Sequence, residues 1–426
     1  MRTNRLLQVA LLGLLVAGPS AATNGMRMTG FGPVQNSMGG VGVGTTLDGA
    51  TMLSNPAGLT EQDFSLVVGG TWFKPTVSYS AVESQLPPSM TGAVVAQPGT
   101  QMNSRRGGSP IPTLAVVYPL GNGLTLGVGA FGVAGMGIDY AQNLYGGGTS
   151  TSYLQMRVTP ALGYKVNDRL SVGLALNAMA AQMKWDVAAG FGQQPHDTST
   201  ALGIGATLGA KYLAAKWLTI GAAYETKSYF QDFRFDVPAH NGVNPATFQP
   251  VPFAASTDRL SLNQPMSATI GVAIAPIDMV VVGLDVQWIN WADTNGTNKP
   301  AFAANTSGAM AWDLGWSNQV VYKMGAQVRP LQSLALRAGY NYGKMPLDPN
   351  CAFENLAFPA VSEHHFSAGV GYDFSKLTLN AGAMWSPAAT ISGANADYPA
   401  NGGQAIKSYT TSMSQVAFDI GIAYRI

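Results

Sequence analysis

Four histidines and a single cysteine are the side chains of this sequence best suited to catalysis or metal binding. His364 and His365 are adjacent and follow Glu363, whereas Cys351 stands alone. Adjacent histidines lack the spacing of a zinc site, and no G-x-S-x-G motif supplies a serine nucleophile for His365. A single cysteine cannot form an intramolecular disulfide. We therefore expect no enzyme, no metal site and no cofactor.

A G-x-G-x-x-G pattern stands at Gly127, Gly129 and Gly132, with Gly135 following. In a dinucleotide site such glycines join a strand to a helix. No helical pattern follows here, so nucleotide binding is not expected. Glycine within a strand indicates a bulge or a bend. We predict a bend at Gly129, Gly132 and Gly135, and ordinary flexibility of the strand is the alternative.

The segments that must position these residues alternate between apolar and small or polar side chains. From Val416 to Ile426 the apolar residues occupy every second position, as expected when successive side chains of a strand point to opposite faces. The chain is 46% apolar and only 11% charged, against roughly 25% charged in soluble domains, and it contains 51 glycines. No apolar run of helical-span length follows the first two dozen residues. This pattern favours a transmembrane β-barrel.

The same alternation, together with the turns and loops that interrupt it, predicts the number of strands. Tight turns such as Gly121-Asn122-Gly123 and Ser375-Lys376 alternate strictly with long connections such as 186–199. Bacterial outer-membrane barrels combine short periplasmic turns with long external loops, and an even strand number leaves both termini in the periplasm. Fourteen strands are predicted, at residues 64–73, 112–119, 124–133, 152–165, 170–185, 200–214, 217–229, 266–275, 278–291, 317–329, 333–342, 364–374, 377–385 and 411–426.

Aromatic residues gather near both ends of these strands, as they do at the two interfaces of a membrane. Near the long loops stand Trp72, Trp185, Trp288, Trp291, Trp316, Tyr342 and Trp385. Near the short turns stand Tyr118, Tyr164, Tyr212, Trp217, Tyr372 and Tyr424. Scattered aromatics of an ordinary β protein are the alternative.

The N-terminus resembles an export signal. Arg2 and Arg5 precede an apolar run, and small residues follow up to Ala22, where cleavage is expected. Without these two arginines the 23 basic residues become 21, against 22 acidic ones, so the mature chain carries no basic footprint for nucleic acid. We predict a signal peptide at 1–22, an N-terminal plug at 23–63 and the barrel at 64–426, since a barrel of this width leaves a lumen to fill.

The plug carries motifs that point to a family. Ser37-x-x-Gly-x-Gly-x-Gly, Asp48-x-Ala-Thr and Asn55-Pro56-Ala57-Gly58-Leu59 resemble the N-terminal hatch of the FadL/TodX family of outer-membrane transport proteins. The resemblance implies passive, hatch-gated uptake of hydrophobic compounds, first of all long-chain fatty acids, with sideways exit at a bend in the third strand. Asn55, Pro56 and Ala57 would form a gating element, or else a purely structural corner, since proline fixes the turn.

Several inward-phased charges could meet such a ligand. Arg157 and Lys323 are candidates for binding its carboxylate by charge-assisted hydrogen bonds, with Phe31 and Phe131 as further contacts. The simpler alternative is that the inward charges pair with one another or with the hatch backbone. These charges are Arg157, Glu225, Lys227, Asp285, Lys323, Arg337, Asp373, Asp419 and Arg425.

Rival functions are an uptake channel for alkanes or aromatic hydrocarbons, a general porin, and a surface receptor. The expected partners are hydrophobic small molecules, outer-membrane lipid with lipopolysaccharide, and the barrel-assembly machinery, with the chain acting as a monomer. The C-terminal strand resembles an assembly signal, although Ile426 replaces the usual phenylalanine.

Overall fold

The structure is a computed structural model of the chain. It describes residues 24–84, 101–141, 149–188, 193–243, 250–296, 302–303, 314–352, 354–394 and 406–426. The predicted signal peptide at 1–22 lies outside these residues.

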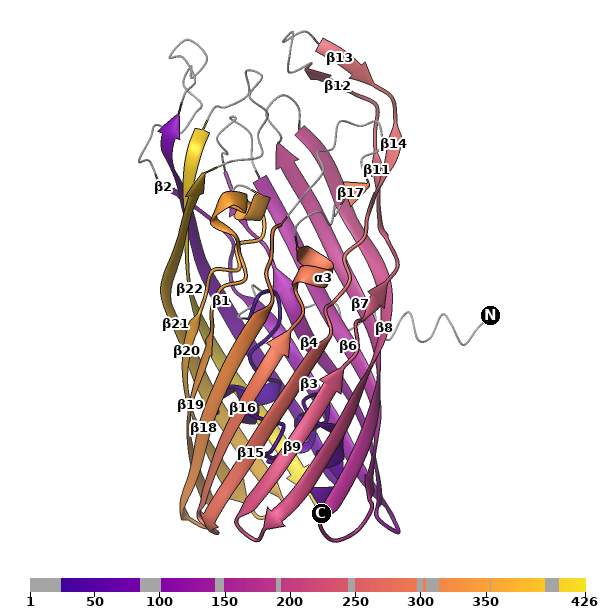
Figure 1. The fold of residues 1–426 in the computed structure, drawn as a ribbon, viewed down its shortest axis with the longest axis vertical. Helices are drawn as coiled ribbons and strands as arrows, with labels where there is room; N and C mark the ends of the chain where they lie inside the picture. The colour runs from indigo at the N-terminus through magenta and orange to yellow at the C-terminus, as the bar shows by residue number, and fades with distance from the viewer. Residues whose placement is uncertain are drawn as a thin grey trace, which may run out of the picture.

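The described chain forms a closed antiparallel barrel of fourteen strands, as the alternation predicts (Figure 1). The wall closes because the first strand pairs with both the second and the last. In order around the wall, the strands are β1 (Ser65–Ser84), β3 (Ser109–Gly121), β4 (Leu124–Met136), β6 (Thr149–Lys165), β7 (Leu170–Ala188), β8 (Gln193–Ala215), β9 (Leu218–Glu225), β15 (Ser267–Ile277), β16 (Val280–Ile289), β18 (Gln319–Leu331), β19 (Leu334–Gly343), β20 (His364–Phe374), β21 (Leu377–Ala394) and β22 (Ile406–Arg425).

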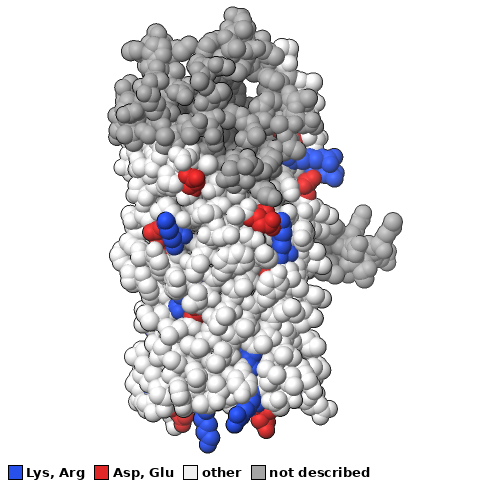
Figure 2. Space-filling model, in the orientation of Figure 1, with Lys and Arg blue, Asp and Glu red and all other residues white. Residues whose placement is uncertain are grey.

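The outer face of the wall is apolar. In β8, Ile204 is 66% exposed while Thr207, three residues later and in the opposite phase, is buried. In β22, Ile420 is 71% exposed and Asp419 is buried. Charged residues are sparse on the side of the barrel seen in Figure 2. Apolar residues point outward and small or polar residues inward, which is the arrangement required of a wall that faces lipid.

The short turns have the backbone geometry that their sequences predict. Gly121, Asn122 and Gly123 have φ values of 88°, 52° and 78°, and Ser375 has a φ of 59°. Positive φ at the centre of a two- or three-residue connection matches the twist of the strands on either side, and glycine and asparagine adopt it most readily.

Several predicted long loops are partly strand, which corrects the sequence prediction. β1 runs to Ser84, β7 and β8 pair up to Ala188 and Gln193, and β21 pairs with β22 up to Ala394. Beyond the membrane both faces of a strand can be polar, so the hydrophobic alternation fades although the hydrogen-bonded ladder continues.

The N-terminal segment, residues 24–63, lies inside the barrel (Figure 1). It contains three short helices, α2 (Gly32–Asn36), η1 (Gly49–Leu53) and η2 (Pro56–Glu61). Inward glycines of the wall face its backbone: a Cβ at Gly173 would lie 2.4 Å from the amide nitrogen of Ala57, and one at Gly339 would lie 2.0 Å from that of Gly39. These glycines let the segment approach the strands more closely than any side chain would permit.

Further elements cover the barrel end that carries the long connections. Three strands form a small sheet, and two others form a hairpin (Figure 1). The additional elements are β2 (Gln101–Asn103), β5 (Asp139–Tyr140), β10 (Tyr229–Phe230), β11 (Phe233–Val237), β12 (His240–Val243), β13 (Pro250–Phe253), β14 (Ser256–Leu260), β17 (Phe302–Ala303), α3 (Ala292–Asn295), η3 (Pro349–Cys351) and η4 (Glu354–Leu356). Among the described residues, no helix is long and apolar enough to cross a membrane.

Three tryptophans assigned to a membrane interface point inward instead. Trp291 and Trp316 are buried and pack edge to face with ring centroids 4.9 Å apart. Trp185 packs against Phe358 in the same apolar cluster. Trp291 and Trp316 lie beyond the regular strands, and the ladder of β7 with β8 is irregular between Met183 and Trp185, so the alternating phase does not hold at these residues. Trp72 is exposed on the outer face as predicted.

Candidate ligand pocket and lateral opening

The Asn-Pro-Ala element joins the N-terminal segment to the wall. The Asn55 side chain donates to the carbonyls of Val43 at 2.8 Å and Ala210 at 3.0 Å, and its Oδ1 accepts from the amide of Ala57 at 3.1 Å. Asn55 therefore caps helix η2 and fastens that helix both to its own segment and to β8. Pro56 stands at the first helical position, where its missing N–H leaves no intrahelical bond unmade.

The N-terminal segment also takes part in a buried ion cluster with the barrel wall. Glu225 of β9 forms ion pairs with Arg157 of β6 and with Arg27 of the N-terminal segment. Nε and Nη1 of Arg157 have no hydrogen-bond partner among the described residues. Arg27 was not predicted as a site residue, although it is the only basic residue between positions 24 and 63. A single basic residue in an otherwise uncharged or acidic segment is the sequence feature that could have identified Arg27 as a site residue.

A second pair of charges faces the cluster across one pocket. Asp285 and Lys323 are cross-strand neighbours in β16 and β18. Oδ2 of Asp285 accepts from the backbone amides of Gly42 and Val43, and Nζ of Lys323 donates to the carbonyl of Thr29 at 3.2 Å. As the simpler alternative predicts, these inward charges pair with one another or hold the backbone of the N-terminal segment.

The four candidate ligand contacts converge on this place. The rings of Phe31 and Phe131 pack edge to face at 6.5 Å, and Phe131 is the cross-strand neighbour of Arg157. Phe31, Lys323 and Glu225 line the same cavity, which has a volume of about 40 Å³. This space holds little more than a water molecule, so a larger ligand requires movement of the N-terminal segment.

The charges of the pocket do not balance. Among the described residues, the cations Arg27 and Lys323 of the pocket and Arg157 beside it stand against the anions Glu225 and Asp285. A charge in a buried site is costly when it has no partner of opposite sign. The described side chains thus carry one more positive than negative charge at this place.

An apolar interior extends from the pocket toward the long loops. It is formed by one continuous cluster of buried side chains rich in methionine and aromatic residues. Its members include Met26, Met136, Met179, Met183, Tyr79, Tyr140, Tyr153, Phe233, Phe235 and Trp291. Methionine side chains are unbranched and adapt to irregular shapes, so this interior can repack around apolar molecules of different form.

The wall separates between β3 and β4. Their ladder ends at the pair Thr113–Phe131, whereas β3 remains paired with β1 as far as Ser109. The pairing of β4 with β6 is irregular between Gly132 and Ala134. An irregularity of the register therefore lies beside Gly132, within the segment for which the bend is predicted.

The N-terminal segment occupies the edge of β4 that β3 leaves. The amide of Met28 donates to the carbonyl of Val133 at 3.1 Å, and the amide of Gly135 donates to the carbonyl of Met26 at 3.2 Å. Arg27 lies between them, paired with Ala134. Arg27, which binds Glu225, is therefore also part of the strip from Met26 to Met28 that covers the gap.

Two prolines of β3 could have predicted this gap from the sequence. Pro110 and Pro112 stand in the same phase of β3, and proline has no backbone N–H to donate. Both still have partners in the register with β1, whereas the ladder with β4 stops immediately beyond them. Proline within a strand marks the place where one ladder ends.

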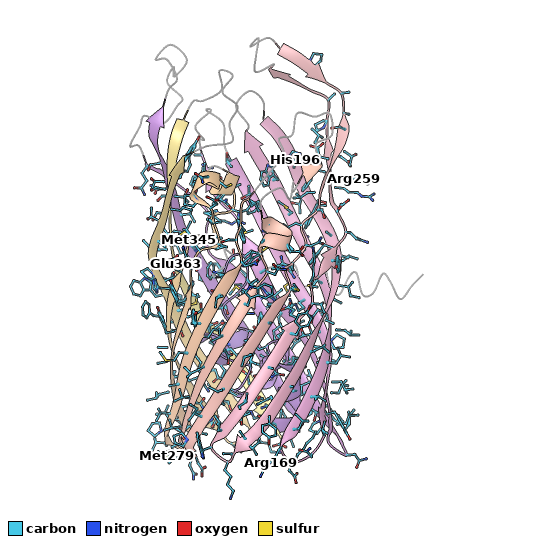
Figure 3. The ribbon with its side chains drawn as sticks, in the orientation of Figure 1. Arg169, His196, Arg259, Met279, Met345 and Glu363 are labelled. Atoms are coloured by element: carbon cyan, nitrogen blue, oxygen red, sulfur yellow. The ribbon has the colours of Figure 1, made fainter. Side chains whose placement is uncertain are left out.

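The histidines form no catalytic arrangement with Glu363. The Glu363 carboxylate accepts from the amide of Met345 at 2.9 Å (Figure 3), and His364 bonds to the hydroxyl of Tyr340 at 2.7 Å. Within the described part of the chain, no group of three or more His, Cys, Asp or Glu residues is placed to hold a metal ion.

The fold is a closed barrel with an apolar outer face, and the N-terminal segment lies within it. Its interior is apolar and ends in a polar pocket. These features are typical of an outer-membrane channel for hydrophobic solutes. The family comparison agrees with this class. The family model described as outer membrane protein transport protein (OMPP1/FadL/TodX) matches residues 34–426. The chain belongs to this family and is an outer-membrane transporter of hydrophobic compounds.

Solved structures share the fold at low sequence identity. A FadL homologue from Pseudomonas aeruginosa has a TM-score of 0.75 at 15% identity, covering 94% of this chain and 99% of its own. The Pseudomonas putida toluene transporter TodX has a TM-score of 0.72 at 17% identity, covering 93% and 99%. The Ralstonia pickettii toluene transporter TbuX has a TM-score of 0.70 at 18% identity, with the same coverage. A search of curated proteins found no matching relative.

Proposed function

We propose that the protein takes up hydrophobic carboxylates passively, with long-chain fatty acids as the first candidates. The observation that carries this proposal is the excess positive charge of the pocket at the end of the apolar interior. Among the described residues, Arg27, Arg157 and Lys323 outnumber Glu225 and Asp285. A fatty acid would place its chain among the methionine and aromatic side chains and its carboxylate among the cations.

The physical basis is the cost of moving each group out of water. Burial of the acyl chain is favourable by about 0.8 kcal/mol per methylene. A carboxylate becomes tolerable in a buried site only with charged hydrogen-bond donors, such as the free Nε and Nη1 of Arg157. A neutral hydrocarbon gains from the first effect and has no use for the second.

We infer that Arg27 couples the ligand to the exit. A ligand carboxylate would compete with Glu225 for Arg27 and Arg157, and would thereby weaken the ion pair that holds Arg27 in place. Arg27 lies within the strip from Met26 to Met28 that covers the edge of β4. Its release would let this strip move and open the gap between β3 and β4 toward the membrane, so that residues 24–63 act as the hatch.

Uptake of neutral or aromatic hydrocarbons is the second candidate. The aromatic lining of the interior favours it, and TodX and TbuX are described as toluene transporters. In that case the ion cluster would serve only to hold the hatch.

Uptake of labelled oleate and toluene by cells that carry the protein separates the two candidates. Arg157→Met should lower oleate uptake at least tenfold and leave toluene uptake unchanged. Lys211→Met is the matched control, since it removes another buried inward cation, ion-paired to Glu61 outside the pocket. Equal loss for both solutes, or oleate uptake at the wild-type rate, would refute the carboxylate assignment.

A hatch also predicts low permeability to hydrophilic solutes. Liposomes that contain the wild-type protein should swell slowly in sugars, whereas deletion of residues 24–60 should raise conductance in planar bilayers. Rapid swelling with the intact protein would favour a general porin.

We further propose that the protein works as a monomer with its short turns and both termini in the periplasm, where the barrel-assembly machinery would receive it.

A further inference from the structure

A second cavity lies at the end of the barrel that carries the short turns, and we call it the short-turn cavity. Its volume is about 230 Å³, which corresponds to roughly seven or eight water molecules. It is separate from the ligand pocket, with which it shares no lining residue. The N-terminal segment supplies Val34, Thr46, Leu47 and Gln62, and the wall supplies Gln327, Arg329, Arg337, Thr378, Asn380 and Arg425.

Three guanidinium groups line this cavity, and among the described residues only that of Arg329 forms an ion pair. Arg329 forms an ion pair with Asp373 at 2.7 Å. Arg337 is buried and donates to the neutral side chains of Gln327 at 2.8 Å and Asn380 at 2.9 Å. Arg425 donates to the carbonyl of Leu47 at 2.8 Å, and its Nε has no hydrogen-bond partner among the described residues.

The nearest further acid does little to balance these charges. Asp48 interacts electrostatically with both Arg425 and Arg337 but does not line the cavity. Its carboxylate accepts from the amide of Ala50 at 3.1 Å as the cap of helix η1. Burial raises the pKa of Asp48, so its charged form is disfavoured. The cavity therefore keeps a positive excess.

The remaining lining determines the class of ligand. Amide and hydroxyl groups of Gln62, Gln327, Thr378 and Thr46 surround the guanidinium groups, and only two lining residues, Val34 and Leu47, are apolar. An acyl chain would find little apolar contact here. A small hydrophilic oxyanion matches the planar donor forks of arginine and the neutral donors around them.

We propose that the short-turn cavity binds a small hydrophilic oxyanion that carries a carboxylate or phosphate group and enters from the short-turn side. Such an anion lies between wall residues Arg337 and Arg425 and the N-terminal segment at Thr46 and Leu47. It links the two parts and stabilises the N-terminal segment in its closed position. This site is independent of the transported solute.

Calorimetric titration of the purified protein tests the proposal, with inorganic phosphate and succinate as separate probes at an ionic strength held constant with sodium chloride. Both probes should bind saturably, and the double variant Arg337→Gln, Arg425→Gln should bind at least tenfold more weakly. Arg169→Gln is the matched control, since Arg169 is an exposed arginine at the same end of the barrel (Figure 3). Equal affinity of the double variant and the wild type would overturn the site.

Two measurements keep the test decisive if the double variant does not assemble. Phosphate should raise the unfolding temperature of the wild-type protein above that in sodium chloride of equal ionic strength, because a ligand stabilises the state that it binds. Absence of both this shift and saturable heat would refute the proposal. Dodecanoate should leave phosphate binding unchanged, and displacement of phosphate by dodecanoate would assign the cavity to the transported amphiphile instead.

Discussion

Replacement of Asn55 by alanine should loosen the N-terminal segment while leaving the barrel wall intact. The substitution removes three hydrogen bonds, to Val43, Ala210 and Ala57. At about 0.5–1.5 kcal/mol each, these bonds contribute about 1.5–4.5 kcal/mol to holding the segment closed. Asn55 is fully buried, so water does not readily replace its donor at the buried bond to the Val43 carbonyl.

Hydrogen exchange of the backbone amides measures this effect directly. Amides of residues 50–61 in the variant should exchange about ten- to a thousand-fold faster than in the wild type, since each 1.4 kcal/mol of opening free energy is a factor of ten. Amides of β7 and β8 should keep their protection. Conductance in planar bilayers should rise in parallel if the segment occludes the lumen.

Two comparisons sharpen this test. Asn55→Asp keeps the acceptor for Ala57 but turns a carboxylate oxygen toward the carbonyls of Val43 and Ala210, so its effect should be at least as large as that of alanine. Asn103→Ala, at an exposed position in β2, should change nothing. Wild-type exchange in Asn55→Ala would show that these bonds do not hold the segment, and the gating reasoning would fail.

Three further substitutions test other parts of the structure. Gly132→Val should fill the gap between β3 and β4 and slow hydrophobic uptake without impairing assembly. Gly107→Val is the control and should take up solute normally, because there is open space around its Cβ. Uptake at the wild-type rate by Gly132→Val would indicate passive flexibility of the strand. Gly209→Ala should displace the Asn-Pro-Ala element, because the new Cβ would lie 2.0 Å from Oδ1 of Asn55, and unchanged exchange at residues 50–61 would contradict this contact. Trp291→Ala should destabilise the mouth of the lumen by about 3–5 kcal/mol, measured from the shift in thermal unfolding, and a shift below the equivalent of about 1 kcal/mol would argue against its packing role.

The sequence predicted the number of strands, their order and the faces of most side chains. It was wrong about the ends of the strands above the membrane and about Trp291 and Trp316. Those residues lie where the alternation no longer reports a lipid-facing side.

Arg157 and Lys323 were predicted from their inward phase, whereas Arg27 was not predicted. Its partner Glu225 is 198 residues away along the chain, and no periodicity relates the two positions. The same holds for the short-turn cavity, which joins Leu47 to Arg425 over 378 residues.

The sequence by itself determined which face each strand residue occupies, because alternation with a period of two and the chemistry of the turns are local properties. Only the tertiary structure decided which inward residues meet. Closing the barrel and inserting the N-terminal segment bring Arg27, Arg157 and Glu225 together, and end the ladder between β3 and β4 where the segment takes its place. Contacts across a lumen depend on the register of every strand between them, and that register is a property of the whole closed sheet.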